Sequence, residues 1–439
     1  MLGCINKQLT MNPQAEELNV IIREQNPAVF EMLSERGRAI FFPKKGILGQ
    51  TAQAKGKKIN ATIGAAMEDD GSIMNMNCLS SQMNIAPASA FPYAPSFGRP
   101  DIRSKWKEML YQKNPSLNGI ELSLPVVTNA LTHALSICGY MFMNEGDSVL
   151  VSDLFWGNYN LTFNQAYGTK YAKYTLFDGD GFNLKSFEEN LSSMPAGRKI
   201  ILLNFPNNPT GYTPTPTEIE SIISILKTDA DKGNQIVVLC DDAYFGLVYE
   251  DGIYEESIFA PLSTAHENIL AVKVDGPTKE DYVWGFRVGF ITYGIKGGTP
   301  ELYEAVAAKT AGAIRGNISN ACNVTQSMLL NAFNAENYSA EKAEKGAMLK
   351  QRYNAVKAAV KNEKYAEYFT PYPFNSGYFM CVQPKEGIDG EALRALLLEK
   401  YSTGVINMAG TIRVAFSAVG ADLIPELFEN IYNACKELS

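Results

Sequence analysis

A lysine and an arginine stand close together in the stretch VDGPTKEDYVWGFRVGF, residues 274–290. Glycines flank both cations, and glycine lets a backbone approach a ligand closely. The apolar run VGFITYG that follows Arg287 predicts a buried strand and offers the arginine no acid. A phosphate would serve instead, because the planar guanidinium binds it with two hydrogen bonds. Lys279, if it lay within reach of that phosphate, could condense with an aldehyde. The alternative is a pair of cations on a solvated loop.

These two needs together point to pyridoxal 5'-phosphate (PLP), which carries both a phosphate and an aldehyde, and other strands offer partners for its ring. The run QIVVLC is followed by Asp241, Asp242 and Tyr244. An acid at the end of a buried strand is costly unless it is paired. Asp241 could pair with a protonated ring nitrogen, and Tyr244 could reach the ring hydroxyl. Spacing alone does not choose between Asp241 and Asp242. Asn208 follows KIILLNF in the sequence NPTG, which is equally typical of a plain turn.

Two further segments could contact such a cofactor. The segment VVTNALTHALSI predicts a strand, a turn and the start of a helix, where the amides of Leu131 and Thr132 would point at an anion. An ordinary capped helix explains that pattern equally well. Trp156 follows another strand, either as a core aromatic or as a plate stacked on a flat ring.

The elements that must position these residues alternate along the chain. Between about residues 76 and 320, short apolar strands such as SVLVSDL and NILAVKVDG alternate with helical patterns such as PTEIESIISILKTDADKG. This alternation predicts an α/β fold with a mostly parallel sheet and helices on both faces. Ligands bind beyond the carboxyl ends of strands in such sheets. We expect residues 76–320 to form a large domain, and residues 1–75 with 321–439 to form a smaller α+β domain. The first 55 residues look helical and then loop-like, ending in KKGILGQTAQAKGKK. The later segment AEKAEKGAMLKQRYNAVKAAVKN is charged on one face and predicts a solvated helix rather than a binding patch.

Bulk properties exclude several classes of protein. The 439 residues carry a net charge of −8 that is spread along the chain, which argues against nucleic acid as a partner. No apolar run reaches transmembrane length, and no apolar segment precedes the N-terminal LGC triplet. The seven cysteines are scattered, which predicts free thiols in a reducing cytoplasm. The two histidines, His133 and His266, give little support to a zinc site or a Ser-His-Asp triad.

From about Ile59 to the C-terminus, the chain resembles the fold type I PLP-dependent aminotransferases, and within them the aspartate and aromatic branch. The resemblance rests on an ordered set of motifs: NPTG, DDAY, TK followed by GFRVG, and TIRVAF. It implies that Lys279 binds PLP covalently and that Arg287 binds its phosphate. It implies Asp241, three residues before the tyrosine, as the partner of the ring nitrogen. Tyr244 and Asn208 match the residues that contact the ring hydroxyl.

Other positions follow from the same resemblance. Leu131 and Thr132 fall where the family binds the phosphate, and Trp156 matches the aromatic residue that stacks on the ring. Tyr93, in YAPSFG, matches a tyrosine that reaches the phosphate in the neighbouring subunit. Gly64, in TIGAA, falls on the glycine beside the substrate. The resemblance thus implies a homodimer with shared active sites.

Substrate recognition is implied at two arginines. Arg413, in TIRVAF, matches the arginine that binds the substrate α-carboxylate, and Asn208 lies beside the substrate as well. Arg315, in AIRGNISNA, matches an arginine that binds a side-chain carboxylate, which would favour aspartate, glutamate and 2-oxoglutarate. Aromatic aminotransferases can keep that arginine, and an exposed loop arginine is the plain alternative.

The sequence departs from the family pattern at three positions. Gly276 stands where a serine often binds the phosphate, so Thr278 or a water would have to substitute. Ala130 stands where glycine is usual, and His133 where glutamine is common.

The resemblance implies a ping-pong transfer of an amino group between an L-amino acid and a 2-oxo acid. A carbon–sulfur lyase or a decarboxylase on the same scaffold is the nearest alternative. A non-catalytic PLP-binding regulator would need a DNA-binding domain, for which the N-terminal segment is too short and not basic enough. A nicotinamide dehydrogenase would need a GxGxxG sequence after a first strand, and the chain has none there.

Overall fold

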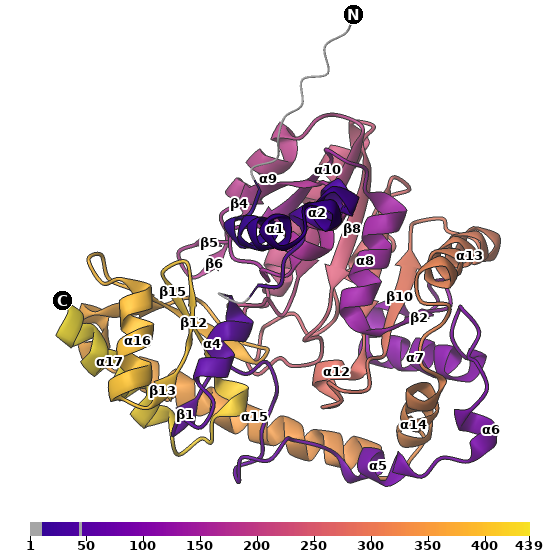
Figure 1. Cartoon of the computed structure of the whole chain (residues 1–439). Coiled ribbons are helices and arrows are strands. Elements are labelled where there is room, and N and C mark those ends of the chain that lie inside the picture. The colour runs from indigo at the N-terminus through magenta and orange to yellow at the C-terminus, as the bar shows by residue number, and fades with distance from the viewer. Residues whose placement is uncertain (1–10, 44–45) are drawn as a thin grey trace, which may run out of the picture.

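The computed structural model describes residues 11–43 and 46–439. The LGC triplet discussed above lies outside these residues. A seven-stranded sheet forms the centre of the molecule (Figure 1). Its strands, from one edge to the other, are β4 (Lys170–Tyr174), β3 (Ser148–Ser152), β7 (Arg198–Asn204), β8 (Gln235–Asp241), β9 (Ile269–Asp275), β10 (Gly289–Gly294) and β2 (Val126–Thr128).

The first five strands in that order are parallel, whereas β10 pairs antiparallel with both β9 and β2. The predicted mostly parallel sheet is therefore confirmed. Successive side chains of a strand point to opposite faces, and in a sheet covered on both sides each face must be apolar. In β3, Leu150 packs into one core, and its neighbours Val149 and Val151 pack into the other.

Helices cover both faces of this sheet. The core beside Leu150 is completed by α9 (Leu184–Ser193), α10 (Pro216–Asp231) and α11 (Phe259–Leu262). The opposite core is completed by α8 (Ala130–Phe142) and α13 (Pro300–Asn317). The start of α10 shows why its sequence folds locally. Thr215 and Glu218 form a reciprocal capping box, and Pro216 occupies the first helical turn, where its missing N–H costs nothing.

A second, four-stranded sheet lies to the left in Figure 1. Its order is β11 (Phe369–Pro371), β12 (Phe379–Pro384), β15 (Thr411–Ala415) and β14 (Ile406–Met408). Helices α16 (Gly390–Lys400) and α17 (Ile424–Leu438) pack in this part of the chain, and β1 (Ile59–Asn60) pairs parallel with β13 (Thr403–Gly404). This last pairing brings N-terminal residues to the C-terminal part, as the predicted small domain requires. The boundaries of the two domains stay a prediction.

Further helices connect the two sheets and form the N-terminal part. Helix α15 (Tyr338–Val360) runs along the base of the molecule in Figure 1. The remaining helices are α1 (Pro13–Gln25), α2 (Pro27–Met32), α3 (Glu35–Ala39), α4 (Ile47–Gln53), α5 (Asn77–Ser80), α6 (Pro87–Ala90), α7 (Pro100–Lys113), α12 (Pro277–Glu280) and α14 (Asn323–Phe333). None of the helices within residues 11–43 and 46–439 combines the length and apolar character needed to cross a bilayer.

Two local expectations need correction. Residues 47–53, expected to be loop, form helix α4, whose Gln50 exchanges hydrogen bonds with the backbone of Asn407. This tertiary support outweighs a sequence that contains a glycine within the helix. Helix α15 was expected to be a solvated helix, but Leu349, Arg352 and Tyr353 are buried. One face of α15 packs against α17, although the many charged residues in its sequence suggested an exposed helix.

Candidate active site

A pocket of about 460 Å³ opens beyond the carboxyl ends of β7, β8 and β9. This volume lies in the range of small-molecule sites. Residues predicted from the sequence meet here from segments far apart along the chain. The predicted residues that line the pocket are Gly64, Leu131, Thr132, Trp156, Asn208, Asp241, Tyr244, Lys279, Arg287 and Arg413.

The structure distinguishes the two adjacent acids at the end of β8. Asp242 is ion-paired with the buried Lys273, and the hydroxyl of Ser257 donates to it at 2.5 Å. Asp241 has no cation within ion-pairing distance among the described residues, although only 3% of its surface is exposed. A buried acid without a cation is costly. Asp241 is therefore the acid that a cationic ligand would satisfy.

Tyr159 holds Asp241 in place, a contact that the sequence analysis missed. Its hydroxyl donates to Asp241 Oδ2 at 2.5 Å, and the backbone N–H of Ala243 donates to Oδ1 at 3.1 Å. Burial raises the pKa of Asp241, whereas the bond from Tyr159 and the charge of Lys279 lower it. Tyr159 directly precedes a π-helical turn, Asn160–Gln165, a conformation often found at functional sites. In the sequence, the only indication of this role of Tyr159 is its place three residues after Trp156, in WGNY.

Lys279 lies on α12, a single turn that follows β9. Its Nζ makes no hydrogen bond or ion pair to any described residue and lies 5.2 Å from the centre of the Tyr244 ring. Burial lowers the pKa of Lys279 to about 8, with a further lowering by Arg287 and an opposing effect of Asp241. The amine is thus easier to deprotonate than an ordinary lysine, as covalent chemistry requires.

One end of the pocket suits an anion. Helix α8 begins there without a side-chain cap, so the first N–H groups of the helix are left for a ligand. Arg287 forms no ion pair with a described residue, and the buried hydroxyl of Thr278 has no partner among them. Ala130 has φ of 64°, a left-handed conformation that explains why glycine is usual there.

Gly276, the departure from the family's serine, has a steric reason. A Cβ at this position would lie 2.9 Å from the carbonyl oxygen of Val288 and 3.1 Å from the Leu131 side chain. Any side chain would therefore force these neighbours to shift. His133 acts locally, because its Nδ1 accepts a hydrogen bond from the backbone of Asn129 just before α8.

Arg413 reaches the pocket from β15 of the second sheet. It is 3% exposed and forms no ion pair with any described residue. Its guanidinium donates to the carbonyl of Thr62 at 3.1 Å and to Asn208 Oδ1 at 3.4 Å, while its Nε has no partner. A buried guanidinium without an acid calls for an anionic ligand. The amide nitrogen of Asn208 and the hydroxyl of Tyr244 also make no hydrogen bond to described residues.

Two predicted residues lie elsewhere. Tyr93 is 91% exposed and does not line the pocket of its own chain. Arg315, near the end of α13, is exposed and donates to Ser319 Oγ at 2.7 Å. Within one chain, neither Tyr93 nor Arg315 lies with the ten predicted residues that line the pocket.

The sequence analysis also missed the apolar wall of the pocket. Ile47 and Leu48 come from α4, Trp284 from the segment after α12, and Phe379 from the start of β12. The ring of Phe379 lies under the guanidinium of Arg413, with 4.2 Å between the centroid and Cζ. Isolated aromatic and aliphatic residues in a sequence resemble core residues, so no local signal marked them.

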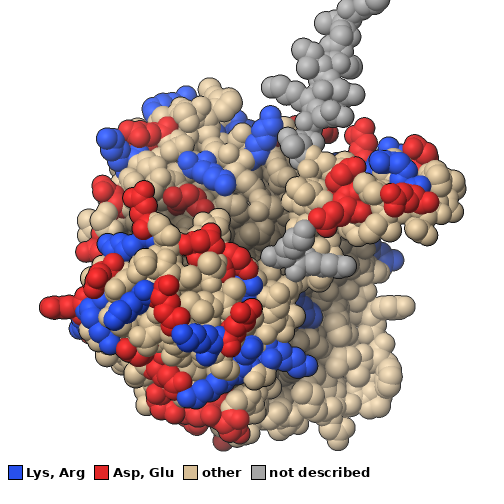
Figure 2. Space-filling view, turned by 60° about the vertical axis from the view of Figure 1, so that its left-hand side comes forward, with Lys and Arg blue, Asp and Glu red and all other residues tan. Residues whose placement is uncertain are grey.

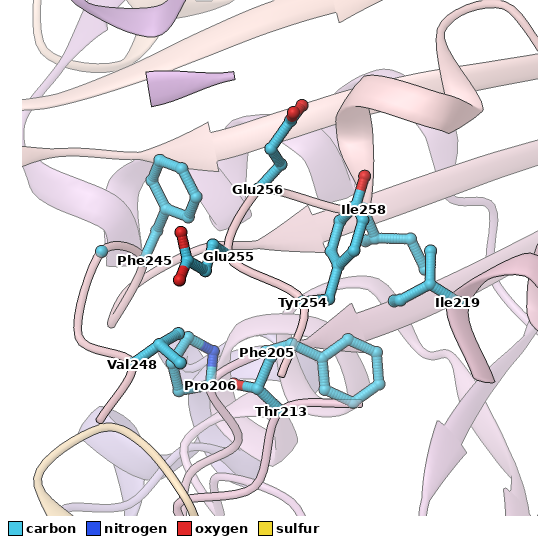
Figure 3. Close-up of a pocket in the computed structure, with 11 residues that line it drawn as sticks. Phe205, Pro206, Thr213, Ile219, Phe245, Val248, Tyr254, Glu255, Glu256 and Ile258 are labelled. Carbon is cyan, nitrogen blue, oxygen red and sulfur yellow. The ribbon is translucent and has the colours of Figure 1, made fainter. Parts of the chain in front are cut away.

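A second cleft, shown in Figure 3, lies among Phe205, Pro206, Tyr254 and Glu255. Its volume of about 10 Å³ has room for about one water molecule. No lysine or arginine lines it. It is therefore not a candidate for binding an anionic cofactor.

Comparison with known proteins fixes the family. Residues 79–431 match the model of the family described as "Aminotransferase class I and II". The chain belongs to this family. An aspartate aminotransferase of Sulfurisphaera tokodaii is 28% identical over 200 residues, which cover 45% of this chain and 47% of that protein. The cytoplasmic aspartate aminotransferase of Caenorhabditis elegans is 26% identical over 295 residues, covering 64% and 68% of the two chains. The chain thus spans about half the length of the first of these relatives in the alignment.

Solved structures agree over nearly the whole chain. An aminotransferase from Anaerococcus prevotii superimposes with a TM-score of 0.82 and 25% identity, covering 92% of this chain and 98% of that one. A kynurenine aminotransferase from Pyrococcus horikoshii superimposes with a TM-score of 0.77 and 18% identity, covering 93% and 98%. The fold of this member of the class I and II aminotransferase family is therefore that of fold type I, as predicted.

The pocket fits the cofactor of this family, PLP. The orphaned hydroxyl of Thr278, the uncapped start of α8 and Arg287 form the donor set that a phosphate needs. Asp241 would meet the ring nitrogen, and Asn208 and Tyr244 would meet the ring hydroxyl. Trp156 lines the same pocket and would stack on the ring.

Proposed function

We propose that this chain is a PLP-dependent aminotransferase that exchanges an amino group between an L-amino acid and a 2-oxo acid by a ping-pong mechanism. The observation that carries the proposal is the meeting of Lys279, an unpaired Asp241 and an unpaired Arg413 in one pocket. The family match supports it. No observation favours a carbon–sulfur lyase, a decarboxylase or a PLP-binding regulator.

Binding and orientation fall to three sets of residues. Arg287, Thr278 and the start of α8 would hold the phosphate, while Asp241 would keep a proton on the ring nitrogen. When bound, PLP withdraws electrons from the bonds at the substrate α-carbon. Arg413 would bind the α-carboxylate with charge-assisted hydrogen bonds, which fixes the orientation of the substrate.

Lys279 would move the proton. Its Nζ, with the pKa lowered to about 8, would accept the proton from the substrate α-carbon. It would then deliver that proton to the cofactor carbon that retains the amino group. The Nζ atom lies 5.2 Å from the centre of the Tyr244 ring and makes no hydrogen bond to a described residue that would compete for the proton. The apolar side chains of Ile47, Leu48 and Trp284 would exclude water from this step.

We propose acidic or aromatic amino acids as substrates. Relatives named as aspartate and aspartate/prephenate aminotransferases support this class. Arg315 would bind a side-chain carboxylate only if it reached a pocket other than that of its own chain, because it lies outside that pocket. The apolar wall beside Arg413 suits an aromatic side chain without further change.

We propose a homodimer with shared active sites. Tyr93 and Phe91, two residues before it, are 91% and 85% exposed, and large apolar side chains exposed next to one another are typical of an interaction surface. Figure 2 shows a broad surface at the lower right that is almost free of charged side chains. In a two-fold dimer, Tyr93 and Arg315 of one subunit could each complete the pocket of the other.

A cytoplasmic location is part of the same proposal. None of the six cysteines among the described residues forms a disulfide, which suits a reducing compartment. On the left side of the face shown in Figure 2, basic and acidic side chains are interspersed rather than gathered into a basic patch, which supports the proposal that nucleic acid is not a partner.

The test replaces Lys279 with alanine. Lys279→Ala should abolish turnover and the visible absorbance of lysine-bound PLP, while Lys309→Ala, at an exposed position on α13, should leave both unchanged. Mixing the inactive Lys279→Ala protein with an inactive Tyr93→Ala protein should restore part of the activity, since one hybrid pocket carries both native residues. Activity in Lys279→Ala would refute the enzyme proposal, and a lack of restoration would refute the shared site.

A further inference from the structure

Two acids directly follow Lys279 and lie buried. Glu280 is 4% exposed and Asp281 is fully buried, although neither faces the pocket. The mechanism above uses neither of them. Two adjacent buried carboxylates next to the residue that binds the cofactor require compensating charges.

Two lysines supply those charges. Lys113 lies 2.8 Å from Glu280 Oε1, and Lys342 lies 2.7 Å from Glu280 Oε2 and 3.0 Å from Asp281 Oδ1. The hydroxyl of Tyr338 also donates to Asp281 at 2.7 Å. Burial would raise the pKa of Glu280, but the two ammonium groups outweigh it and lower the pKa to about 2. We refer to Lys113, Glu280, Asp281 and Lys342 as the charge cluster.

The charge cluster joins three helices. Lys113 is the last residue of α7, the acids extend from α12, and Lys342 lies in the second turn of α15. Farther along α15, Arg352 donates to the carbonyl of Ser417 at 2.6 Å, just beyond the strand that carries Arg413. Figure 1 shows α15 extending from the region below α12 toward the second sheet. The turn with Lys279 and the strand with Arg413 are thus tied to the same helix.

Lys279 depends on such an anchor for its position. A helix of a single turn has little stability of its own, and the Nζ atom has no hydrogen bond to a described residue that would fix it. The amine is therefore placed by its backbone. That backbone is held by Tyr378, whose hydroxyl donates to the carbonyl of Lys279 at 2.5 Å, and by the two acids that follow.

A role in stability alone explains the cluster poorly. Buried ion pairs often contribute no more to stability than apolar residues of similar size, because desolvation offsets their attraction. What they do provide is a defined geometry. The charge cluster contains two positive and two negative groups. Glu280 directs one oxygen at each ammonium group, and Asp281 directs Oδ1 at Lys342.

We propose that Glu280 and Asp281 are positioning residues, which with Lys113 and Lys342 fix the turn that presents the Lys279 amine to the pocket. This inference rests on the proposed function of Lys279. Displacing a reacting group by about 1 Å can cost about 100-fold in rate, so small movements of the turn should be measurable.

The experiment uses the full chain freed of PLP. Glu280→Gln and Lys342→Met remove one charge each while keeping similar shapes, and Glu280→Asp keeps the charge but shortens its reach. Lys345→Met is the matched control, because Lys345 lies on the same helix and pairs at 2.9 Å with Glu68 rather than with α12. The rate of covalent PLP capture is followed by visible absorbance, and borohydride reduction with mass spectrometry assigns the adduct to Lys279. Thermal unfolding is recorded in parallel.

We expect Glu280→Gln and Lys342→Met to slow capture by about tenfold or more relative to Lys345→Met, with a matching loss of kcat at saturating PLP. The double variant should lose less than the product of the single effects, since both remove the same contact. If Glu280→Gln does not fold, Glu280→Asp and Lys342→Met carry the test. Capture within about twofold of the Lys345→Met rate, even with a lower unfolding temperature, would overturn the proposal. A wild-type protein without any adduct at Lys279 would instead overturn the proposed function.

Discussion

The hydrogen bond from Tyr159 to Asp241 can be tested without turnover. Tyr159→Phe removes one hydroxyl from a side chain that is 1% exposed and leaves the ring to stack on Phe155 and Phe163. Among the described residues, the Asp241 carboxylate would then accept a hydrogen bond only from the backbone N–H of Ala243. The variant thus isolates the contribution of one bond to one carboxylate.

The magnitude follows from the kind of bond that is lost. A hydrogen bond to a charged group contributes about 1.5–3 kcal/mol. At pH 7 we expect the PLP-free variant to lose about that much free energy of unfolding and to bind PLP about 10- to 100-fold more weakly. The pKa of Asp241 is raised in the folded protein, and the bond from Tyr159 favours the ionised form. Its charge-assisted contribution is therefore present above that pKa and is lost as pH falls through it.

The assay compares Tyr159→Phe with Tyr171→Phe. The hydroxyl of Tyr171 is also buried, but it has no hydrogen-bond partner among the described residues, so removing it should cost nothing. Urea unfolding of the PLP-free proteins at pH 7 and pH 4 gives the free energies, and absorbance titration gives the PLP dissociation constants. The gap between the variants should shrink at pH 4. Equal stability and equal PLP affinity of the two variants at pH 7 would refute the role of Tyr159.

Two further predictions concern Lys279 and the arginines. The rate of covalent PLP capture by the PLP-free protein should rise with pH around a midpoint of about 8, because only the neutral Lys279 amine reacts. Asp241→Asn should move this midpoint to lower pH, because the carboxylate raises the pKa of Lys279, and an unchanged midpoint would contradict the assignment of the midpoint to Lys279. Arg413→Ala should lower kcat/KM for aspartate and phenylalanine alike by about 30-fold or more, whereas Arg315→Ala should lower it for aspartate only; an unaltered aspartate value in Arg315→Ala would remove the case for acidic substrates.

The fold was predictable because its strands are short apolar runs separated by well-marked helices. Buried parallel strands such as KIILLNF are apolar on both faces, and that pattern needs no tertiary information. Helix α4 was not predictable in this way. Its sequence is short and contains a glycine, and it is supported by Asn407, a residue more than 350 positions away.

The site was predictable where chemistry requires a rare residue type at a strand end, as at Lys279 and Asp241. It was not predictable where a common residue acquires its role from a distant neighbour. Tyr159 lies 82 positions from Asp241, and Glu280 is paired with Lys113 from another helix. In the sequence, each of these looks like an ordinary core or surface residue. Their roles arise only when the fold places an acid or an amine opposite them.

The two arginines proposed to bind substrate differ in whether a single chain places them at the pocket. Arg413 is buried beside the pocket of its own chain and pairs with no acid among the described residues. A single chain would therefore suffice for Arg413 to bind one substrate carboxylate. Arg315 is exposed and bonded to Ser319 on the surface of α13. A single chain therefore offers one carboxylate site and an apolar wall. Recognition of a second carboxylate would have to come from the proposed dimer, so the proposed preference for acidic substrates depends on that dimer rather than on the fold of one chain.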